Sequence, residues 1–200
     1  MQKSSIRRGA AAVVALSAAV LVVTGCQPGD TDTDTGAGSS TGSPVSSQPT
    51  GTAVKTCAAG SLKARAYQAA DRPQGTGTGA AVVQFTNAGG KACVLRGHPT
   101  VAGAANGSPE LNVPLEVTPI GSASPVRLAP GGRAWLKLTF VQVQGEGDGY
   151  CESGSAPVLY PTMVIGLPGA GAHQVALDDG EFAECDGTLT ATAVTATKPS

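Results

Sequence analysis

Beyond Cys57, apolar residues come in short runs separated by turn residues, and this pattern constrains the fold more than any other feature of the chain. The runs are rich in Val, Leu and Thr and cover residues 62–68, 80–87, 92–101, 113–118, 126–128, 134–144, 158–167, 173–177 and 188–195. Gly, Pro, Asn and Asp gather between them at 87–90, 106–109, 129–132, 168–171 and 178–180. The pattern predicts an all-β domain, built as an antiparallel β-sandwich.

A helical fold is disfavoured because no window of about 12 residues free of Gly and Pro keeps a strong apolar stripe of period 3.6. The closest is 61–72, whose stripe is mostly Ala. Residues 134–140 instead alternate, so we assign one face of that strand to the core. The core face carries Ala134, Leu136, Leu138 and Phe140. Trp135, on the other face, is expected to pack at a sheet margin, with an exposed ligand platform as the alternative.

The first 26 residues have the layout of an export signal. Lys3, Arg7 and Arg8 precede an apolar run over 10–23 that only Ser17 interrupts. A helix of about 14 residues is roughly 21 Å long, which is short of the ~30 Å hydrocarbon core of a bilayer. We therefore expect a signal peptide over residues 1–25 that is removed, rather than a permanent membrane span.

Val23-Thr24-Gly25-Cys26 resembles the bacterial lipobox, in which an aliphatic residue and two small residues precede a cysteine that receives lipid. A thiolate is a good nucleophile for accepting the lipid, and two acyl chains give a stable anchor where one is marginal. We expect Cys26 to be lipidated and to hold the protein on the outer face of the plasma membrane. The alternative is an ordinary secretory signal whose apolar run happens to end in Cys.

Residues 26–55 are expected to form a disordered tether. They are mostly Thr, Ser, Gly, Asp and Pro, without an aromatic residue. A flexible chain of about 29 residues has an r.m.s. span of roughly 30 Å. Asp30, Asp32 and Asp34 alternate with Thr, but they lack the central Gly and distal Glu of a calcium loop. The folded domain is expected to cover residues 56–197.

The charge balance argues against nucleic acid as a partner. The whole chain has 13 Lys plus Arg and 14 Asp plus Glu. Removal of the signal takes away three cations, so the mature chain has 10 against 14, a net charge of −4. A mildly acidic chain without a basic run has no polybasic patch for phosphates or anionic lipid.

Four cysteines remain once Cys26 is assigned to the anchor. An even number in an exported domain predicts two disulfides. Three connectivities are possible, and we favour Cys57–Cys93 with Cys151–Cys185. A zinc site is disfavoured because the chain has no C-x-x-C pair.

Several motifs of the folded region resemble the family DUF4232, which is common in actinobacterial secreted proteins and lipoproteins. In chain order they are Cys57, T-N-A-G-G at 86–90, C-V-L-R-G-H-P at 93–99, L-A-P-G at 128–131, Cys151 and Cys185. The resemblance covers about residues 57–195 and implies an immunoglobulin-like β-sandwich. His98 and Thr100 depart from the family's usual aromatic residue and Gly. The family has no established activity, so the resemblance implies architecture and location only.

The residues that carry chemistry form no recognisable catalytic set. His98 and His173 are the only histidines, and the chain has no G-x-S-x-G elbow. Five carboxylates fall within nine residues at Asp178, Asp179, Glu181, Glu184 and Asp186. A cation site or a catalytic carboxylate pair is conceivable there, but a solvated hairpin turn at 178–180 explains the segment better. No cofactor or metal is implied.

Three functions are compatible with these features. We expect a non-catalytic module that binds an envelope protein or glycan as a monomer; weaker alternatives are a structural surface protein and a glycan-acting envelope hydrolase. Candidate surface-binding residues are Trp135, His98, Asp178, Asp179 and Glu181.

Overall fold

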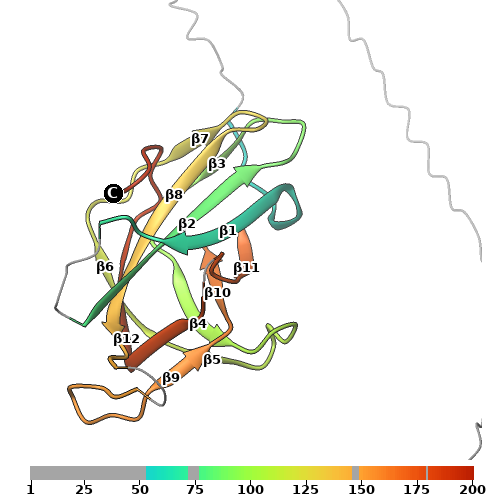
Figure 1. Ribbon diagram of the computed structural model, residues 1–200. Helices are drawn as coiled ribbons and strands as arrows, with labels where there is room; N and C mark the ends of the chain where they lie inside the picture. Colours follow the sequence, from blue (N-terminus) through green and yellow to red (C-terminus); the bar gives the residue numbers. More distant parts are fainter. Residues whose placement is uncertain (1–52, 72–76, 146–148, 179) are drawn as a thin grey trace, which may run out of the picture. The chain divides into compact units, whose positions relative to one another are not determined.

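The computed structural model describes residues 53–71, 77–145, 149–178 and 180–200, which Figure 1 shows as a β-rich domain. Contacts between Cα atoms divide the chain into residues 1–48 and 49–200, and the described residues all belong to the second unit. Within the described residues, the helical structure is one 3₁₀ turn, η1 (Ala59–Ser61), and strands dominate. The predicted all-β class is confirmed.

The described strands form three sheets. The largest joins β1 (Leu62–Gln68), β2 (Thr78–Asn87), β8 (Arg133–Gln142), β12 (Phe182–Thr192) and β6 (Glu116–Ile120) in that order, and β9 (Val158–Tyr160) pairs with β12. The second sheet has the order β11 (Gly171–Val175), β10 (Thr162–Leu167), β4 (Thr100–Ala104) and β5 (Asn112–Pro114). The third pairs β3 (Cys93–Leu95) with β7 (Val126–Leu128). These pairings are antiparallel except that of β12 with β6, which is parallel and departs from the antiparallel prediction.

One core cluster joins the two larger sheets. Phe85 of β2 and Leu136 of β8 belong to it together with Met163 and Ile165 of β10, and each of these side chains is fully buried. The four residues assigned to the core from the alternation of 134–140 are all buried, with exposed fractions of 0, 0, 0 and 7%. The opposite face of β8 therefore points away from this core, and Trp135 lies on that face.

Several predicted strands are divided in the structure because prolines interrupt them. The run 92–101 becomes β3 and β4 with Pro99 between them, and 158–167 becomes β9 and β10 with Pro161 between them. Proline cannot donate to a ladder, so each strand ends and the chain continues in a different sheet. The run 113–118 is divided at Leu115, whose amide instead donates to the carbonyl of Val101.

Gly103 of β4 allows a close approach between the two larger sheets. A Cβ atom at this position would overlap the ring of Tyr160, which ends β9. Only a residue without a side chain leaves room for the ring, so the Gly103–Tyr160 contact helps to place β9 against β4.

We predict that Gly103→Ala lowers the free energy of unfolding by about 1–3 kcal/mol, the usual cost of overpacking a core. Gly90→Ala is the matched control, because a Cβ there has no atom within 4 Å and its effect should stay within about 0.5 kcal/mol. Urea unfolding of both variants measures the difference. Equal stability of the two variants would contradict the packing role.

Candidate functional site

Two disulfides hold the domain. They join Cys57 to Cys93, with Cα atoms 4.8 Å apart, and Cys151 to Cys185, with Cα atoms 5.8 Å apart. These are the pairs favoured from the sequence. The first connects the segment before β1 to β3, and the second connects the loop before β9 to β12.

Cys26 lies outside the described residues, and so do Asp30, Asp32 and Asp34 of the predicted tether.

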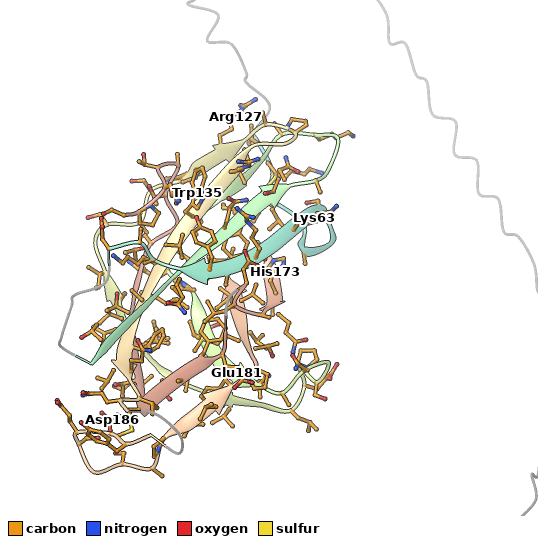
Figure 2. The ribbon with its side chains drawn as sticks, in the orientation of Figure 1. Lys63, Arg127, Trp135, His173, Glu181 and Asp186 are labelled. Atoms are coloured by element: carbon orange, nitrogen blue, oxygen red, sulfur yellow. A yellow bond between two sulfur atoms is a disulfide. The ribbon has the colours of Figure 1, made fainter. Side chains whose placement is uncertain are left out.

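The candidate binding residues come from separate parts of the fold. Trp135 lies on β8, His98 follows β3, and Asp178 and Glu181 lie in the connection between β11 and β12, while Asp179 is outside the described residues. Figure 2 shows Trp135 and Glu181 toward different ends of the domain. The bridge between Leu177 and Gly180 closes the turn that was predicted at 178–180. These residues therefore do not form one site.

Both histidines have structural hydrogen bonds. Nε2 of His98 lies 3.1 Å from the carbonyl oxygens of Ile120 and Gly121. Nε2 of His173 lies 3.2 Å from the carbonyl oxygen of Ala170, and its ring meets the edge of Phe85 at a centroid distance of 5.5 Å. Across the described ranges, no group of three or more His, Cys, Asp or Glu side chains is placed to hold a metal ion.

The acidic segment is divided by strand alternation. β12 begins at Phe182. The sequence pattern predicts its start at residue 188, since the acidic residues before that position favour a turn. Phe182 and Glu184 are both fully buried, whereas Asp186 is exposed. Asp186 has a φ of 71° at a register shift of β12, and the Ser153 hydroxyl donates to its carboxylate over 2.6 Å. Hydrogen bonds from Ser153 and Ser155 lower the pKa of Asp186.

Glu184 is a buried carboxyl close to the backbone amides of Gly187 and Thr188. Both of its carboxyl oxygens are buried, and neither accepts a hydrogen bond of ordinary geometry. Burial raises the pKa of Glu184 above its ordinary value of 4.5; the nearby amides of Gly187 and Thr188 oppose this rise, and the charge of Asp186 adds to it. The pKa of Tyr160 is also raised, first by burial and then by the charge of Glu184. Glu184 thus makes the fold sensitive to protonation.

The outer surface of β1, β2 and β8 carries cations and no acids. The three strands contain Lys63, Arg65, Arg133 and Lys137, but no Asp or Glu. Their registers align Lys63, Thr86 and Arg133 in one row and Arg65, Gln84 and Trp135 in the next. Since the intervening residues face the core, these rows point outward. We call this surface the cationic face, formed by Lys63, Arg65, Tyr67, Gln84, Thr86, Arg133, Trp135 and Lys137.

Contacts with neutral groups hold several of these cations. The Arg65 guanidinium and the Lys198 ammonium lie 5.3 and 5.1 Å from the centroid of the Tyr67 ring, within the range of cation–π attraction. Arg65 also donates to the Gln84 side chain at 3.5 Å, and Gln84 donates to the Thr86 hydroxyl at 3.3 Å. Two cations thus share one aromatic ring.

The aromatic residues of the cationic face form its centre. Tyr67 and Trp135 are half-buried and pack against Ala69, Ala80 and Val82, in a small cluster separate from the main core. Trp135 therefore packs on the face of the sheet rather than at the predicted sheet margin, because β8 lies between β2 and β12. Its indole N–H is buried without a hydrogen-bond acceptor. The C-terminal segment lies along the same face: Thr195 pairs with Trp135, and Lys137 donates to the Ser200 backbone oxygen over 2.6 Å.

A second group of cations borders a hollow of about 730 Å³. Lys55, Lys91 and Arg127 line it together with Ser61 and the Gly89–Gly90 turn, and its lining contains no Asp or Glu. All three cations are exposed. Ser61 precedes Lys63 of the cationic face by two residues. Figure 2 shows Lys63, Arg127 and Trp135 toward one end of the domain and Glu181 and Asp186 toward the other.

Sequence reasoning missed the cationic face because neither the total charge nor a search for basic runs shows that cations on separate strands become neighbours in the sheet. The available signal was the alternation of Lys63 with Arg65, and of Arg133 with Lys137, in strands without acids. The folded domain therefore gathers cations from separate strands although the chain has no basic run, and the expectation that it does not bind nucleic acid or anionic lipid stays a prediction.

We predict that Glu184→Gln raises the thermal midpoint at pH 7 by roughly 2–4 °C. A carboxyl whose pKa is raised on folding contributes stability that is fully present below its unfolded pKa, near 4.5, and that is lost as pH rises through the higher folded value. The stability of the parent should therefore fall as pH rises through the folded pKa of Glu184, and the stability of the variant should not. Calorimetry from pH 4 to 8 measures both curves; exposed Glu181→Gln is the control, and parallel curves for parent and Glu184→Gln would refute the effect.

Comparison with known proteins assigns the folded part of the chain to a family. A search of curated proteins finds no match. A family model described as "Domain of unknown function (DUF4232)" matches residues 57–195, from the first disulfide cysteine to the strand pairing of Thr195. This match spans more than half of the chain and agrees with the family resemblance of its motifs. The chain therefore belongs to the DUF4232 family.

Proposed function

We propose that this protein is a non-catalytic binding module of the cell envelope, lipid-anchored through Cys26 and carried on the tether of residues 26–55. We further propose that its domain is an immunoglobulin-like sandwich and that its ligand is recognised at the cationic face. The observation that carries the binding function is the cationic face itself. Four cations lie on three adjacent strands without an acid, although the mature chain has a net charge of −4.

Exposed like charges on one surface repel one another only weakly, and no acid on the three strands offsets them. Such clusters are typical of surfaces that attract an oppositely charged partner. The cations here extend from a rigid sheet, which keeps their spacing constant and favours recognition over a purely structural role.

The two disulfides indicate an oxidising, extracytoplasmic environment. Among the described residues, no helix is long and apolar enough to cross a membrane. The proposed anchor rests on the lipobox-like Val23-Thr24-Gly25-Cys26, which ends the apolar run of the signal-like segment.

We predict that the mature protein is recovered in the membrane fraction with a diacylated N-terminal Cys26, and that Cys26→Ser releases it into the medium. Mass spectrometry of the N-terminal peptide and immunoblots of the two fractions measure this. Thr24→Ser keeps a small residue before the cleavage site and should leave anchoring unchanged. An unmodified parent protein in the medium would overturn the anchor.

The binding role is tested separately from the anchor. Chemical cross-linking on intact cells should capture a species that disappears when Lys63, Arg65 and Arg133 are all changed to Gln. A structural surface protein would tolerate these exposed substitutions without any change in captured material. Unchanged capture by the triple variant would assign binding to another surface.

A further inference from the structure

The cationic face holds its charges several ångströms apart rather than around one point. Lys63 and Arg65 are two residues apart on β1, so their Cα atoms are separated by about 7 Å. Lys63 and Arg133 lie on either side of Thr86, two strand spacings or about 10 Å apart. Such an array matches a ligand with several negative groups distributed along its length.

The surface between the cations offers aromatic and hydrogen-bonding groups. Tyr67 and Trp135 pack over β2, and the half-buried Thr86 supplies a hydroxyl between the cations of β1 and β8, whereas the Gln84 amide is buried and bonded to Arg65 and Thr86. Aromatic rings and hydroxyls suit sugar rings and their hydroxyl groups, whereas cations suit carboxylate or phosphate substituents.

From these observations we propose that the cationic face binds a linear anionic glycan, a polysaccharide that carries carboxylate or phosphate groups. The proposal deepens the binding function proposed above and rests on it. The hollow bordered by Lys55, Lys91 and Arg127 extends the binding surface beyond the start of β1 and accommodates a further anionic group of the same polymer.

A membrane surface fits the cationic face less well. The large apolar side chains that are exposed in the described part of the chain are Leu111, Val113, Ile120, Val141, Tyr150, Val158 and Leu159. Of these, Val141 alone lies on the outer surface of β1, β2 and β8, at the opposite end of β8 from Arg133. A face that enters a bilayer interface presents apolar side chains among its cations. Here the aromatic rings are half-buried against the sheet.

An acidic peptide that adds a strand to the sheet fits less well too. β1 is an edge strand of its sheet, but the amide of Asp178 already donates to the Ala66 carbonyl over 3.0 Å. Strand addition needs a run of free backbone groups along the edge, and this contact interrupts it in the middle of β1.

Binding to polymers of defined charge tests the proposal on the purified chain from residue 26 with Cys26→Ser, which has no lipid and needs no detergent. The probes are polygalacturonate for carboxylates, phosphorylated dextran for phosphates, unmodified dextran as the neutral glycan, and vesicles containing phosphatidylglycerol. We expect binding to at least one anionic glycan, weakening as salt is raised, and none to unmodified dextran.

The triple variant Lys63→Gln, Arg65→Gln, Arg133→Gln should weaken binding at least about tenfold at ~0.1 M salt, since three surface charges no longer contribute. Ala105→Glu, Leu111→Glu and Ala156→Glu together make the matched control, because they change the net charge equally at exposed positions outside the three strands. This control should lose less than about threefold, as expected for weak long-range repulsion. Lys55→Gln, Lys91→Gln, Arg127→Gln tests the hollow in the same assay.

Each result separates the possibilities. Equal loss in the face variant and the matched control, or equal binding of dextran, overturns recognition by the cationic face. Binding of vesicles without binding of either anionic glycan assigns the face to lipid instead. Because the assay does not depend on lipidation, failure of the anchor at Cys26 leaves its outcome unaffected. If the triple variant loses its cross-linked species on cells but the parent binds no glycan, the binding function stands and the glycan ligand is rejected.

Discussion

The antiparallel pairing of β2 with β8 is the interaction on which the rest of the structure depends. It runs without interruption from Thr78 opposite Val141 to Thr86 opposite Arg133. Because side chains alternate along each strand, this register sends Val83, Phe85, Leu136 and Leu138 into the core. The same register places Gln84, Thr86, Arg133 and Trp135 on the opposite surface. A slip of one residue would exchange the two faces, so core formation and the layout of the cationic face are set by one constraint.

The two ends of the domain use charge in different ways. Toward one end, cations are exposed on a rigid sheet and beside an open hollow. In β12, by contrast, Glu184 is enclosed beside a disulfide cysteine, and its carboxyl accepts no hydrogen bond of ordinary geometry. Exposed charges cost little and remain available to a ligand, whereas an enclosed carboxyl couples folding to pH. We therefore expect salt to act on the exposed cations and acidity to act on Glu184.

Sequence reasoning was sufficient for local structure and insufficient for long-range register. Alternation identified the core face of β8, and cysteine number with spacing favoured the observed disulfides. The division of strands at Pro99 and Pro161 was not predicted, because a proline ends a strand without saying which sheet the next strand joins. The cationic face was missed because Lys63 and Arg133 become neighbours only through Thr86, and the burial of Glu184 was missed because a dense acidic segment resembles a turn. Lipidation of Cys26 stays a prediction.

The C-terminal segment takes part in the surface that we propose for binding. Lys198 lies over Tyr67, Thr195 pairs with Trp135, and the Ser200 backbone oxygen accepts a hydrogen bond from Lys137. Any polypeptide joined after Ser200 would therefore leave directly from the cationic face and compete for its contacts. A purification tag or fluorescent fusion at this terminus therefore changes the surface that we propose for binding.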